Sequence, residues 1–307
     1  MTDAHERLLD ELRPSAFAIA YRMLGSVAEA EDVVQEALLR VHRALAAGEE
    51  LKSPRAYVAT VATRLAIDQL RSARTRRESY VGEWLPEPLV TTPSDDPAAR
   101  AELTESLSIA FLVLLESLSP EQRAALLLRD VFGYEYEEIA AIIGKREDNV
   151  RQLAARARRH VEERRPRFEV APERRDALAE RFFAATEDGD LGALEALLAD
   201  DVALHGDGGG KVPALARSLH GRGRVARTLL AWARVGARLP GASVQRAWVN
   251  GQPGALLFDG GRHLISVIAL EIADGRVQAV SSIVNPDKLA HLGPVADFTG
   301  LLRRPAH

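Results

Sequence analysis

Apolar residues recur every three to four positions along much of the first half of the chain. Between residues 24 and 41 this spacing places one apolar face on a helix, with charged and amide side chains opposite. The apolar positions are Leu24, Val27, Ala30, Val33, Val34, Ala37, Leu38 and Val41. The pattern predicts an amphipathic helix, and by itself it is typical of any helical bundle with a solvated polar face.

A second helix is predicted directly after Ser53. A serine hydroxyl can accept a hydrogen bond from the free backbone N–H groups at a helix start, and Pro54 suits the first helical position because no donor is needed there. An apolar stripe at helical spacing follows. Its members are Tyr57, Val58, Val61, Leu65 and Leu70. Helical pattern therefore covers about residues 5–75.

Prolines interrupt this pattern between residues 83 and 97, where the sequence reads EWLPEPLVTTPSDDP. Proline lacks a backbone donor and disfavours helix at the residue before it, so the stretch is predicted to be an extended linker. Trp84 is conspicuous, because a lone tryptophan beside prolines usually packs on something, and a partner domain is one candidate. Helical pattern resumes over about residues 102–165.

Residues 134–160 have the pattern of a helix-turn-helix. Two helices that cross steeply at a tight turn need a small residue at their contact, a glycine in the turn and apolar residues facing inward. Ala140 is the small residue, Gly144 is in the turn, and Ser119 with Gln122 is expected to cap a supporting helix upstream. The inward positions are Ile139, Ile143, Val150 and Leu153. On this segment alone, a plain helical hairpin is the alternative.

Glycine becomes frequent in the C-terminal part of the chain. Residues 1–170 contain 5 of the 22 glycines, and residues 171–307 contain the other 17. Helical patterns over about 173–189, 191–198 and 223–239 precede alternating segments from residue 247 to 285 that are separated by turn residues. The pattern predicts a mixed α+β domain after two helical blocks.

The composition excludes several classes of protein. The chain has no cysteine, hence no disulfide framework, thiolate zinc site or cysteine nucleophile. Its first residues are charged and unlike a signal peptide, and no apolar run approaches the ~20 residues of a membrane span, so the expected location is the cytoplasm. The net charge of −4 argues against a nucleic-acid-binding protein only if the chain is treated as a whole.

Local charge changes that interpretation. Residues 52–77 carry seven bases and one acid, and residues 144–167 carry nine bases and four acids. Basic helices of this kind favour contact with phosphates, whereas a solvated charged face, the alternative, would favour mixed signs. Two strongly positive segments are therefore concealed by a sum near neutrality.

The order of these segments resembles the sigma-70 family of transcription factors. A basic TRLAIDQLRSARTRR helix, a linker and then SPEQRAALLLRDVFGYEYEEIAAIIG are similar to regions 2 and 4 of the extracytoplasmic-function type. Three strings, WLPEP (84–88), DGGGK (207–211) and NPDKL (285–289), resemble the signature of its subgroup with a SnoaL-like C-terminal extension. The resemblance covers roughly residues 5–292.

This resemblance implies a multidomain fold. Two all-α sigma domains, the second with the helix-turn-helix, would precede an α+β SnoaL-like cone of the nuclear-transport-factor-2-like kind. The expected boundaries are 1–77 for region 2, 78–101 for the linker, 102–167 for region 4, 172–295 for the SnoaL-like domain and 296–307 for a tail.

The resemblance also implies roles for individual residues. Core RNA polymerase, through its β′ clamp, is expected to bind Glu31, Asp32, Gln35 and Glu36. The −10 promoter element is expected to bind Lys52, Ser53, Arg55, Arg64, Asp68, Arg71 and Arg74. The −35 element is expected to bind Arg146, Asn149, Arg151, Gln152, Arg156 and Arg159. Many relatives have asparagine where this chain has Arg64, and the turn before the recognition helix lacks their usual serine or threonine, leaving Asp148 or Asn149 as its cap.

The C-terminal domain is expected to regulate in cis, through contact with the sigma domains. The residues implied are Trp84, Pro86, Glu87, Asp207, Gly208, Gly209, Gly210, Lys211, Asn285, Pro286, Asp287 and Lys288. Expected partners are the β and β′ subunits of core polymerase, promoter DNA and an unidentified small ligand, with no membrane, cofactor or metal. Acid–base catalysis by His205, Asp207, Asp259 or His263 is not expected, since short polar residues beside glycine mostly form turns.

Two other functions compete with a regulated initiation factor. One is a cyclase or isomerase fused to a DNA-binding module, and the other is a one-component repressor. A repressor needs only the helix-turn-helix, so the acidic helix and the basic −10-like helix argue against it.

Overall fold

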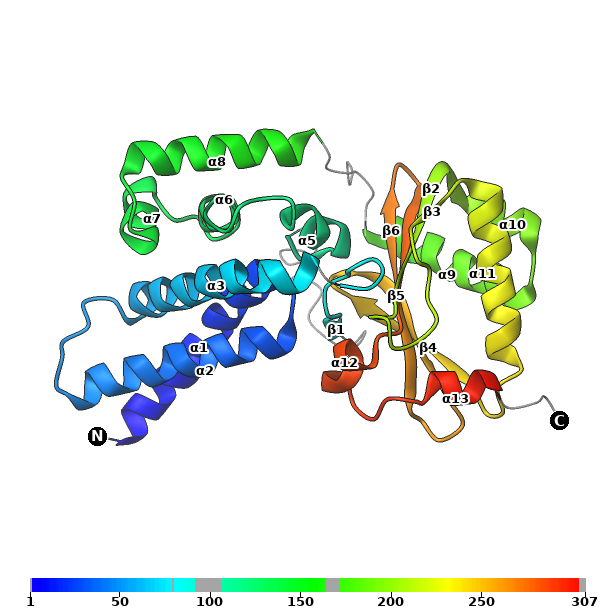
Figure 1. Cartoon of the computed structure of the whole chain (residues 1–307), viewed down its shortest axis with the longest axis horizontal. Helices are drawn as coiled ribbons and strands as arrows, with labels where there is room; N and C mark the ends of the chain where they lie inside the picture. Colours follow the sequence, from blue (N-terminus) through cyan, green and yellow to red (C-terminus); the bar gives the residue numbers. More distant parts are fainter. Residues whose placement is uncertain (1, 79, 92–105, 164–171, 304–307) are drawn as a thin grey trace. The chain divides into compact units, whose positions relative to one another are not determined.

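The computed structural model describes residues 2–78, 80–91, 106–163 and 172–303, which belong to two compact units (Figure 1). The first unit combines Met1–Ser79 with Leu114–Arg165, and the second combines Tyr80–Val113 with Pro166–His307. The chain therefore leaves the helical unit, contributes its linker to the second unit, returns to the helical unit and then enters the second unit again.

Three helices open the first unit: α1 (Thr2–Leu24), α2 (Val27–Ala46) and α3 (Pro54–Glu78). The Ser26 hydroxyl accepts the Glu29 N–H at 3.1 Å, and the Ser53 hydroxyl accepts the Ala56 N–H at 3.2 Å, so serines begin α2 and α3. Both predicted helices are confirmed, with Leu24 ending α1 rather than beginning α2. No helix in the described ranges is long and apolar enough to cross a bilayer.

The second block of this unit carries the helix-turn-helix. After α5 (Ile109–Leu115), α6 (Pro120–Leu126) begins with the predicted capping box and runs into a π-helical turn at Leu127–Val131. The pair α7 (Tyr136–Ile143) and α8 (Glu147–Glu162) follows. Gly144 ends α7 with a φ of 67°, the left-handed conformation that glycine adopts without strain.

Two details of the helix-turn-helix differ from the prediction. Its core contains Ile139, Ile142, Val150 and Ala154, whereas Ile143 and Leu153 are half-buried and pack around it. The recognition helix begins after Arg146, which makes no side-chain cap, so neither Asp148 nor Asn149 occupies the capping position. Ile139 and Val150 are thus confirmed as inward positions, while Ile142 and Ala154 take the core positions expected for their neighbours Ile143 and Leu153.

A seven-stranded sheet forms the second unit, in the order β1-β4-β5-β6-β7-β2-β3. All neighbours are antiparallel except β2 and β7, which are parallel. The strands are β1 (Val90–Thr91), β2 (Leu198–Asp207), β3 (Leu219–His220), β4 (Ser243–Val249), β5 (Gln252–Phe258), β6 (Leu264–Ala273) and β7 (Arg276–Ile283). This is the α+β organisation predicted for the C-terminal part.

Helices α9 (Pro172–Asp188), α10 (Leu191–Leu197) and α11 (Arg222–Ala237) lie along this sheet (Figure 1). Their apolar faces form one core with the strands, including Phe182 from α9, Leu194 from α10 and Leu229 from α11. The chain continues through α12 (Pro286–Leu289), a short 3₁₀ turn (Ala290–Leu292) and α13 (Phe298–Arg303), so part of the expected tail is helical.

The linker is part of the second unit's packing. Its residues Val90–Thr91 form β1 and pair with β4, which places Val90 opposite Val249. Leu85, 1% exposed, and Ile109 join a second apolar core with Val267, Ile283 and Leu289. The described part of the proline-rich segment is therefore an element of the sheet domain.

Candidate functional site

The carboxylate of Asp207 fastens the linker inside the second unit. Asp207 ends β2 and is fully buried. One carboxylate oxygen accepts the Tyr80 hydroxyl at 2.5 Å and the Gly209 N–H at 3.0 Å, and the other accepts the Leu85 N–H at 2.8 Å. Burial, followed by the hydrogen bond to Asp207, raises the pKa of Tyr80, so its phenol stays a donor. A buried carboxylate is stable only with such a set of donors.

Lys288 supplies the opposite charge. Its side chain is 8% exposed, and its ammonium group lies 2.6 Å from the second oxygen of Asp207. The same ammonium donates to the Leu85 carbonyl and lies over the rings of Trp84 at 4.4 Å and Tyr80 at 4.9 Å. Trp84 thus packs on the C-terminal part of the chain, as expected of a tryptophan beside prolines. Asp207 and Lys288 with Tyr80–Leu85 are called the linker clamp below.

The DGGGK and NPDKL strings meet at this clamp. Lys211 pairs with Asp287 at 2.5 Å, a pair so exposed that it contributes little to stability. Asn285 donates to the Tyr80 hydroxyl at 3.0 Å and caps α12 through Asp287, while Pro286 occupies the first helical position.

Glycine is required at the three central positions of the DGGGK string. At Gly209 the φ is +59°, and an added Cβ would lie 2.3 Å from the Asn285 amide. At Gly208 an added Cβ would lie 2.3 Å from the Val212 carbonyl oxygen, and at Gly210 it would meet Val81 of the linker at 2.9 Å. The glycine run therefore brings the backbone close to the linker, where side chains would not fit.

Further contacts bind the linker along its length. Glu83 is bonded to His205 at 2.7 Å and to the Ser218 hydroxyl at 2.9 Å. Burial alone would raise the pKa of Glu83, but the hydrogen bonds of His205 and Ser218 outweigh it and lower that pKa. His291 lies 2.9 Å from the Pro88 carbonyl oxygen. Among the other predicted regulatory residues, Pro86 is buried and Glu87 half-buried.

Asn250 binds the chain both within the linker and after it. Its side-chain oxygen accepts the Leu89 N–H at 3.0 Å and its backbone N–H donates to the Leu89 carbonyl at 2.8 Å. Its amide nitrogen donates to the Leu107 carbonyl at 2.9 Å. Leu89 within the linker and Leu107 after it are therefore held by one residue beside β4.

Glu271 marks the exit from the linker. The carboxyl group is fully buried on β6, where it is bonded to the Ser108 hydroxyl and to the backbone of Ala110 at the start of α5. Burial raises its pKa to about 7, and the two hydrogen bonds only partly oppose that rise. Glu271 consequently titrates near neutral pH, far above an exposed glutamate.

The contribution of Glu271 to stability should therefore fall as the pH rises from about 4.5 to about 7. The folded-state pKa of Glu271 lies above its ordinary value of 4.5, so the favourable contribution is complete below pH 4.5 and is lost as the pH rises through about 7. The full loss is about 3 kcal/mol. Glu271→Gln should remove this part of the pH dependence of the thermal unfolding midpoint between pH 5 and 8, whereas the exposed Glu180→Gln should retain it. Identical pH profiles for wild type and Glu271→Gln would contradict this role.

The residues predicted to bind the −10 element lie on α3 and the turn before it. Lys52, Ser53, Arg55 and Asp68 are exposed. Arg64 instead donates to the Ile142 carbonyl at 2.7 Å and the Ala141 carbonyl at 2.9 Å. These carbonyls belong to the last turn of α7, where a cation complements both unsatisfied acceptors and the helix dipole. The side chain of Arg74 lies outside the described residues.

Two more arginines connect the helical blocks of the first unit. Arg71 pairs with Glu121 of α6 at 2.5 Å. Arg123 of α6, with a side chain 3% exposed, donates to the Met23 carbonyl in the last turn of α1 at 2.6 Å and pairs with Glu116 at 2.8 Å. Burial lowers the pKa of Arg123 to about 9. A guanidinium from each block thus binds a helix C-terminus of the other, and the −10-like helix contacts the helix-turn-helix.

The other predicted surfaces are separate from these contacts. Glu31, Asp32 and Gln35 are exposed on one face of α2, and Glu36 is half-buried and paired with Arg40. The residues predicted to bind the −35 element lie on α8 and at its N-cap, and all are exposed: Arg146, Asn149, Arg151, Gln152, Arg156 and Arg159. Arg151 pairs with Glu147 at 2.5 Å and lies over the ring of Tyr136, which fixes its direction.

The second unit contains a cavity of about 830 Å³ between its sheet and helices. Its wall is mostly apolar, with Phe182, Leu230, Trp232 and Ile268 among its residues. The four residues considered for catalysis, His205, Asp207, Asp259 and His263, are not in this wall. Asp207 and His205 belong to the linker contacts, and Asp259 accepts the Gly261 and His263 N–H groups in a turn.

Several residues of the linker contacts were not predicted. Tyr80, Ser218, Asn250, Glu271 and His291 are single polar residues in segments without a motif. Trp84 indicated that the linker packs on another part of the protein, but the sequence did not identify which residues it contacts. Arg64 was noticed as a departure from the family pattern, but its contact with α7 depends on tertiary packing.

Known proteins match this chain over nearly its full length. The family model for Sigma-70 region 2 matches residues 8–76, and that for Sigma-70, region 4 matches residues 108–161. The chain is 40% identical over 288 residues to the ECF RNA polymerase sigma factor SigJ of Mycobacterium tuberculosis, covering 91% of each chain. It is 34% identical over 274 residues to a probable ECF RNA polymerase sigma factor, SigI, of the same species, covering 88% of this chain and 90% of the relative. The crystal structure of SigJ aligns with a TM-score of 0.73 at 36% identity, over 91% of this chain and 96% of that one.

Proposed function

This chain belongs to the extracytoplasmic-function sigma factors of RNA polymerase, and from that premise we propose that its SnoaL-like domain restrains promoter-directed transcription in cis by holding the linker. The observation that carries the proposal is the linker clamp, in which Asp207 and Lys288, both buried, bind Tyr80 and Leu85. Charged groups are seldom buried without a partner, and here each has the other and the linker.

Connectivity explains how holding the linker restrains the helical blocks. The linker joins the −10-like block to the −35-like block; Tyr80 at its start is bound by Asp207, and Leu89 within it and Leu107 after it are both bound by Asn250. A loop closed in this way keeps the blocks that precede and follow it on short tethers. A short tether raises the effective concentration of one block for the other. It therefore favours contacts between the blocks, such as the hydrogen bond from Arg64 to the Ile142 carbonyl of α7.

In the proposed mechanism, contact between the blocks competes with promoter binding. The exposed acidic face of α2, with Glu31, Asp32 and Gln35, would bind the β′ subunit of core polymerase. Helix α3 and the turn before it would bind the −10 element, and α8 would enter the major groove of the −35 element with Asn149 and Gln152 toward base edges. Arg64 and Arg71 leave their partners on α7 and α6 when α3 binds DNA.

The regulatory domain is proposed to act by binding, without catalysis. None of the four residues considered for catalysis is in the cavity wall, the Glu187 carboxylate in that wall is paired with Arg246, and Asp207 already accepts four hydrogen bonds. The proposed partners are core polymerase through its β and β′ subunits, promoter DNA and the chain's own linker. The proposed site of action is the cytoplasm, where these partners reside.

Reconstituted transcription tests the sigma-factor activity. Core polymerase with the full chain is expected to give a promoter-dependent transcript, and core polymerase alone is expected to give none. Substituting Asp207 or Lys211 separates the regulatory role from initiation, since both lie outside the DNA-binding helices. No promoter-dependent transcript from the full chain or from residues 1–171 would overturn the initiation mechanism.

The apolar cavity is the proposed receptor for a small ligand. Gly206, Pro213, Ala214 and Leu215 are in its wall and flank Asp207–Lys211 along the chain. An added Cβ at Gly206 would lie 3.1 Å from the Leu215 backbone nitrogen, so the two segments are in tight contact. A ligand that moves this wall would therefore move the residues of the clamp.

A fluorescent probe of apolar binding sites tests whether the cavity accepts ligands. Anilinonaphthalene sulfonate is expected to bind the full chain saturably, with increased and blue-shifted emission, because cavities of this size and polarity accept drug-sized molecules. Ala255→Phe should remove most of the signal because the added ring occupies the cavity. Ala231→Phe, an exposed α11 position outside the wall, should retain it. Equal signals from both variants would contradict a ligand site here.

A further inference from the structure

Helix α11 carries an unbroken positive charge. Its range Arg222–Ala237 and the following Arg238 contain five arginines and no acidic residue. Four of them, Arg224, Arg227, Arg234 and Arg238, are exposed. At 100° per residue they fall within an arc of about 80°, and from first to last they extend about 21 Å along the axis. They are called the α11 arginine stripe below.

These four guanidinium groups make no ion pair with any residue in the described ranges. Nearby arginines of the same unit do: Arg222 pairs with Asp200 at 2.5 Å, and Arg246 pairs with Glu187 at 2.6 Å. A face that only kept the protein in solution would be expected to carry mixed charges, as α9 does with Arg174 and Arg181 among acids. None of the four arginines of the stripe therefore has an ion-pair partner among the described residues.

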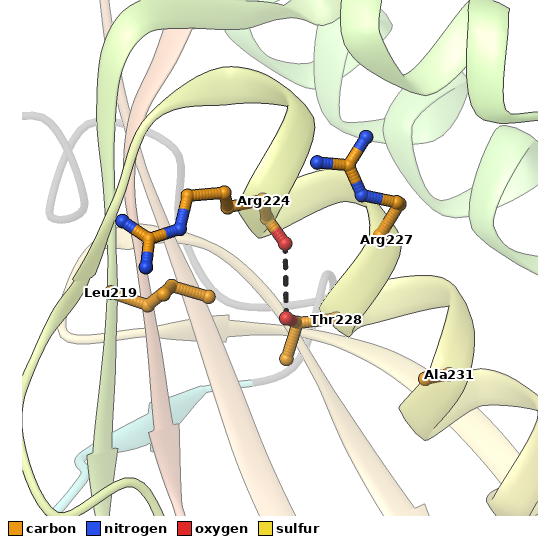
Figure 2. A pocket seen from close by; sticks show the side chains of 5 residues that line it. All are labelled: Leu219, Arg224, Arg227, Thr228 and Ala231. Atoms are coloured by element: carbon orange, nitrogen blue, oxygen red, sulfur yellow. Dashed lines mark hydrogen bonds between the residues drawn. The ribbon is translucent and has the colours of Figure 1, made fainter.

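The stripe is also held rigidly. The opposite face of α11 is buried in the sheet domain's core through Val225, Ala226, Leu229 and Leu230. Arg224 and Arg227 line a shallow depression with Leu219, Thr228 and Ala231. Figure 2 shows the two arginines extending to either side of Thr228, whose hydroxyl donates to the Arg224 carbonyl at 2.9 Å. Arginines in a row on an anchored helix lose less backbone entropy on binding than the same residues on a loop.

We propose that the α11 arginine stripe binds the phosphate backbone of duplex DNA, giving the regulatory domain its own contact with DNA. Duplex DNA carries one negative charge per ~1.7 Å of axis, so a rigid row of this length faces many phosphates. The stripe's remaining exposed side chains, Ala231 and Val235, have no donors or acceptors for base edges. The contact therefore adds affinity without adding sequence preference, and it is independent of the linker clamp.

Binding of the full chain to a nonspecific 40-base-pair duplex, measured by fluorescence anisotropy at several salt concentrations, tests this surface. The slope of log K against log salt is negative, and each lost phosphate contact reduces its magnitude by about 0.9, so Arg224→Gln/Arg227→Gln should reduce that magnitude by about 2. The matched control is Arg174→Gln/Arg181→Gln on α9, which should keep the wild-type slope. Because the duplex contains no promoter, the result does not depend on promoter recognition or on transcription.

Three results would overturn the proposal. One is no binding of the duplex by the wild-type chain at 50 mM salt. Another is an equal slope and affinity for the stripe variant and the control variant. The third is a stripe variant that loses binding to polyglutamate or single-stranded RNA but retains its binding to the duplex, which would assign the stripe to another polyanion.

Discussion

Asp207→Asn is expected to release the linker from the sheet domain and to cause the largest local change of any single substitution in that domain. The variant keeps the shape of the side chain but removes its charge, which leaves the Lys288 ammonium, 8% exposed, without its anionic partner. Breaking a buried ion pair on one side costs about 3–5 kcal/mol. The Leu85 N–H, which donates to Asp207, and the Leu89 N–H nearby should exchange with deuterium much faster than in the wild-type chain.

Two variants separate this effect from general destabilisation. Asp259→Asn removes another carboxylate that holds a turn of the same sheet but does not contact the linker, so linker exchange should remain slow. Asp207→Asn/Lys288→Met removes the stranded charge as well and should recover part of the lost protection, because no unpaired charge then remains buried. Slow linker exchange in Asp207→Asn would contradict the role of the clamp.

Arg123→Met is expected to separate the two helical blocks of the first unit. The substitution preserves much of the apolar stem but removes the donor to the Met23 carbonyl and the ion pair with Glu116. A hydrogen bond from a charged donor contributes about 1.5–3 kcal/mol, and the side chain is only 3% exposed, so little of that is returned by water. Other links between the blocks remain in the variant, among them Arg64 and Arg71 on the more exposed α3 surface and the Arg22 guanidinium over the Phe132 ring at 5.4 Å, and we expect them to be weaker.

Spin labels can measure this separation directly because the chain has no cysteine. His42→Cys on α2 and Glu162→Cys on α8 provide exposed label sites in the two blocks. Electron–electron distance measurements should give one narrow distribution for the wild-type background and a longer, broader one for Arg123→Met. Arg129→Met is the matched control, because Arg129 bonds Tyr134, pairs with Glu135 and lies over the Tyr136 ring, all within its own block. An unchanged distribution in Arg123→Met would contradict the closed contact.

Local signals in the sequence predicted the helical unit well. Ser53, Ser119 and Gly144 mark helix ends through short-range hydrogen bonds and backbone conformation, which depend on few neighbours. The inward face of the helix-turn-helix was misplaced by one residue, at Ile143 rather than Ile142, because both positions are apolar and only packing selects between them.

The linker contacts could be predicted only in part. The strings around Asp207 and Lys288 pointed to a regulatory role through family resemblance, but not to each other or to Tyr80. Residues about 80 and 120 positions apart meet there, and no periodic pattern reports such a contact. The proline-rich segment was expected to be an extended linker; its extended backbone is confirmed, but its pairing as β1 was not predicted, since only the fold shows that the edge of β4 is free to accept a short strand.

Promoter-dependent transcription by core polymerase with the wild-type chain, Asp207→Asn and Asp259→Asn tests the central claim most directly. If the sheet domain restrains the factor by holding the linker, Asp207→Asn should increase the transcript several-fold at equal protein concentration, and Asp259→Asn should match the wild type. An unchanged or lower transcript from Asp207→Asn, in a sample whose linker amides exchange rapidly, would contradict the claim.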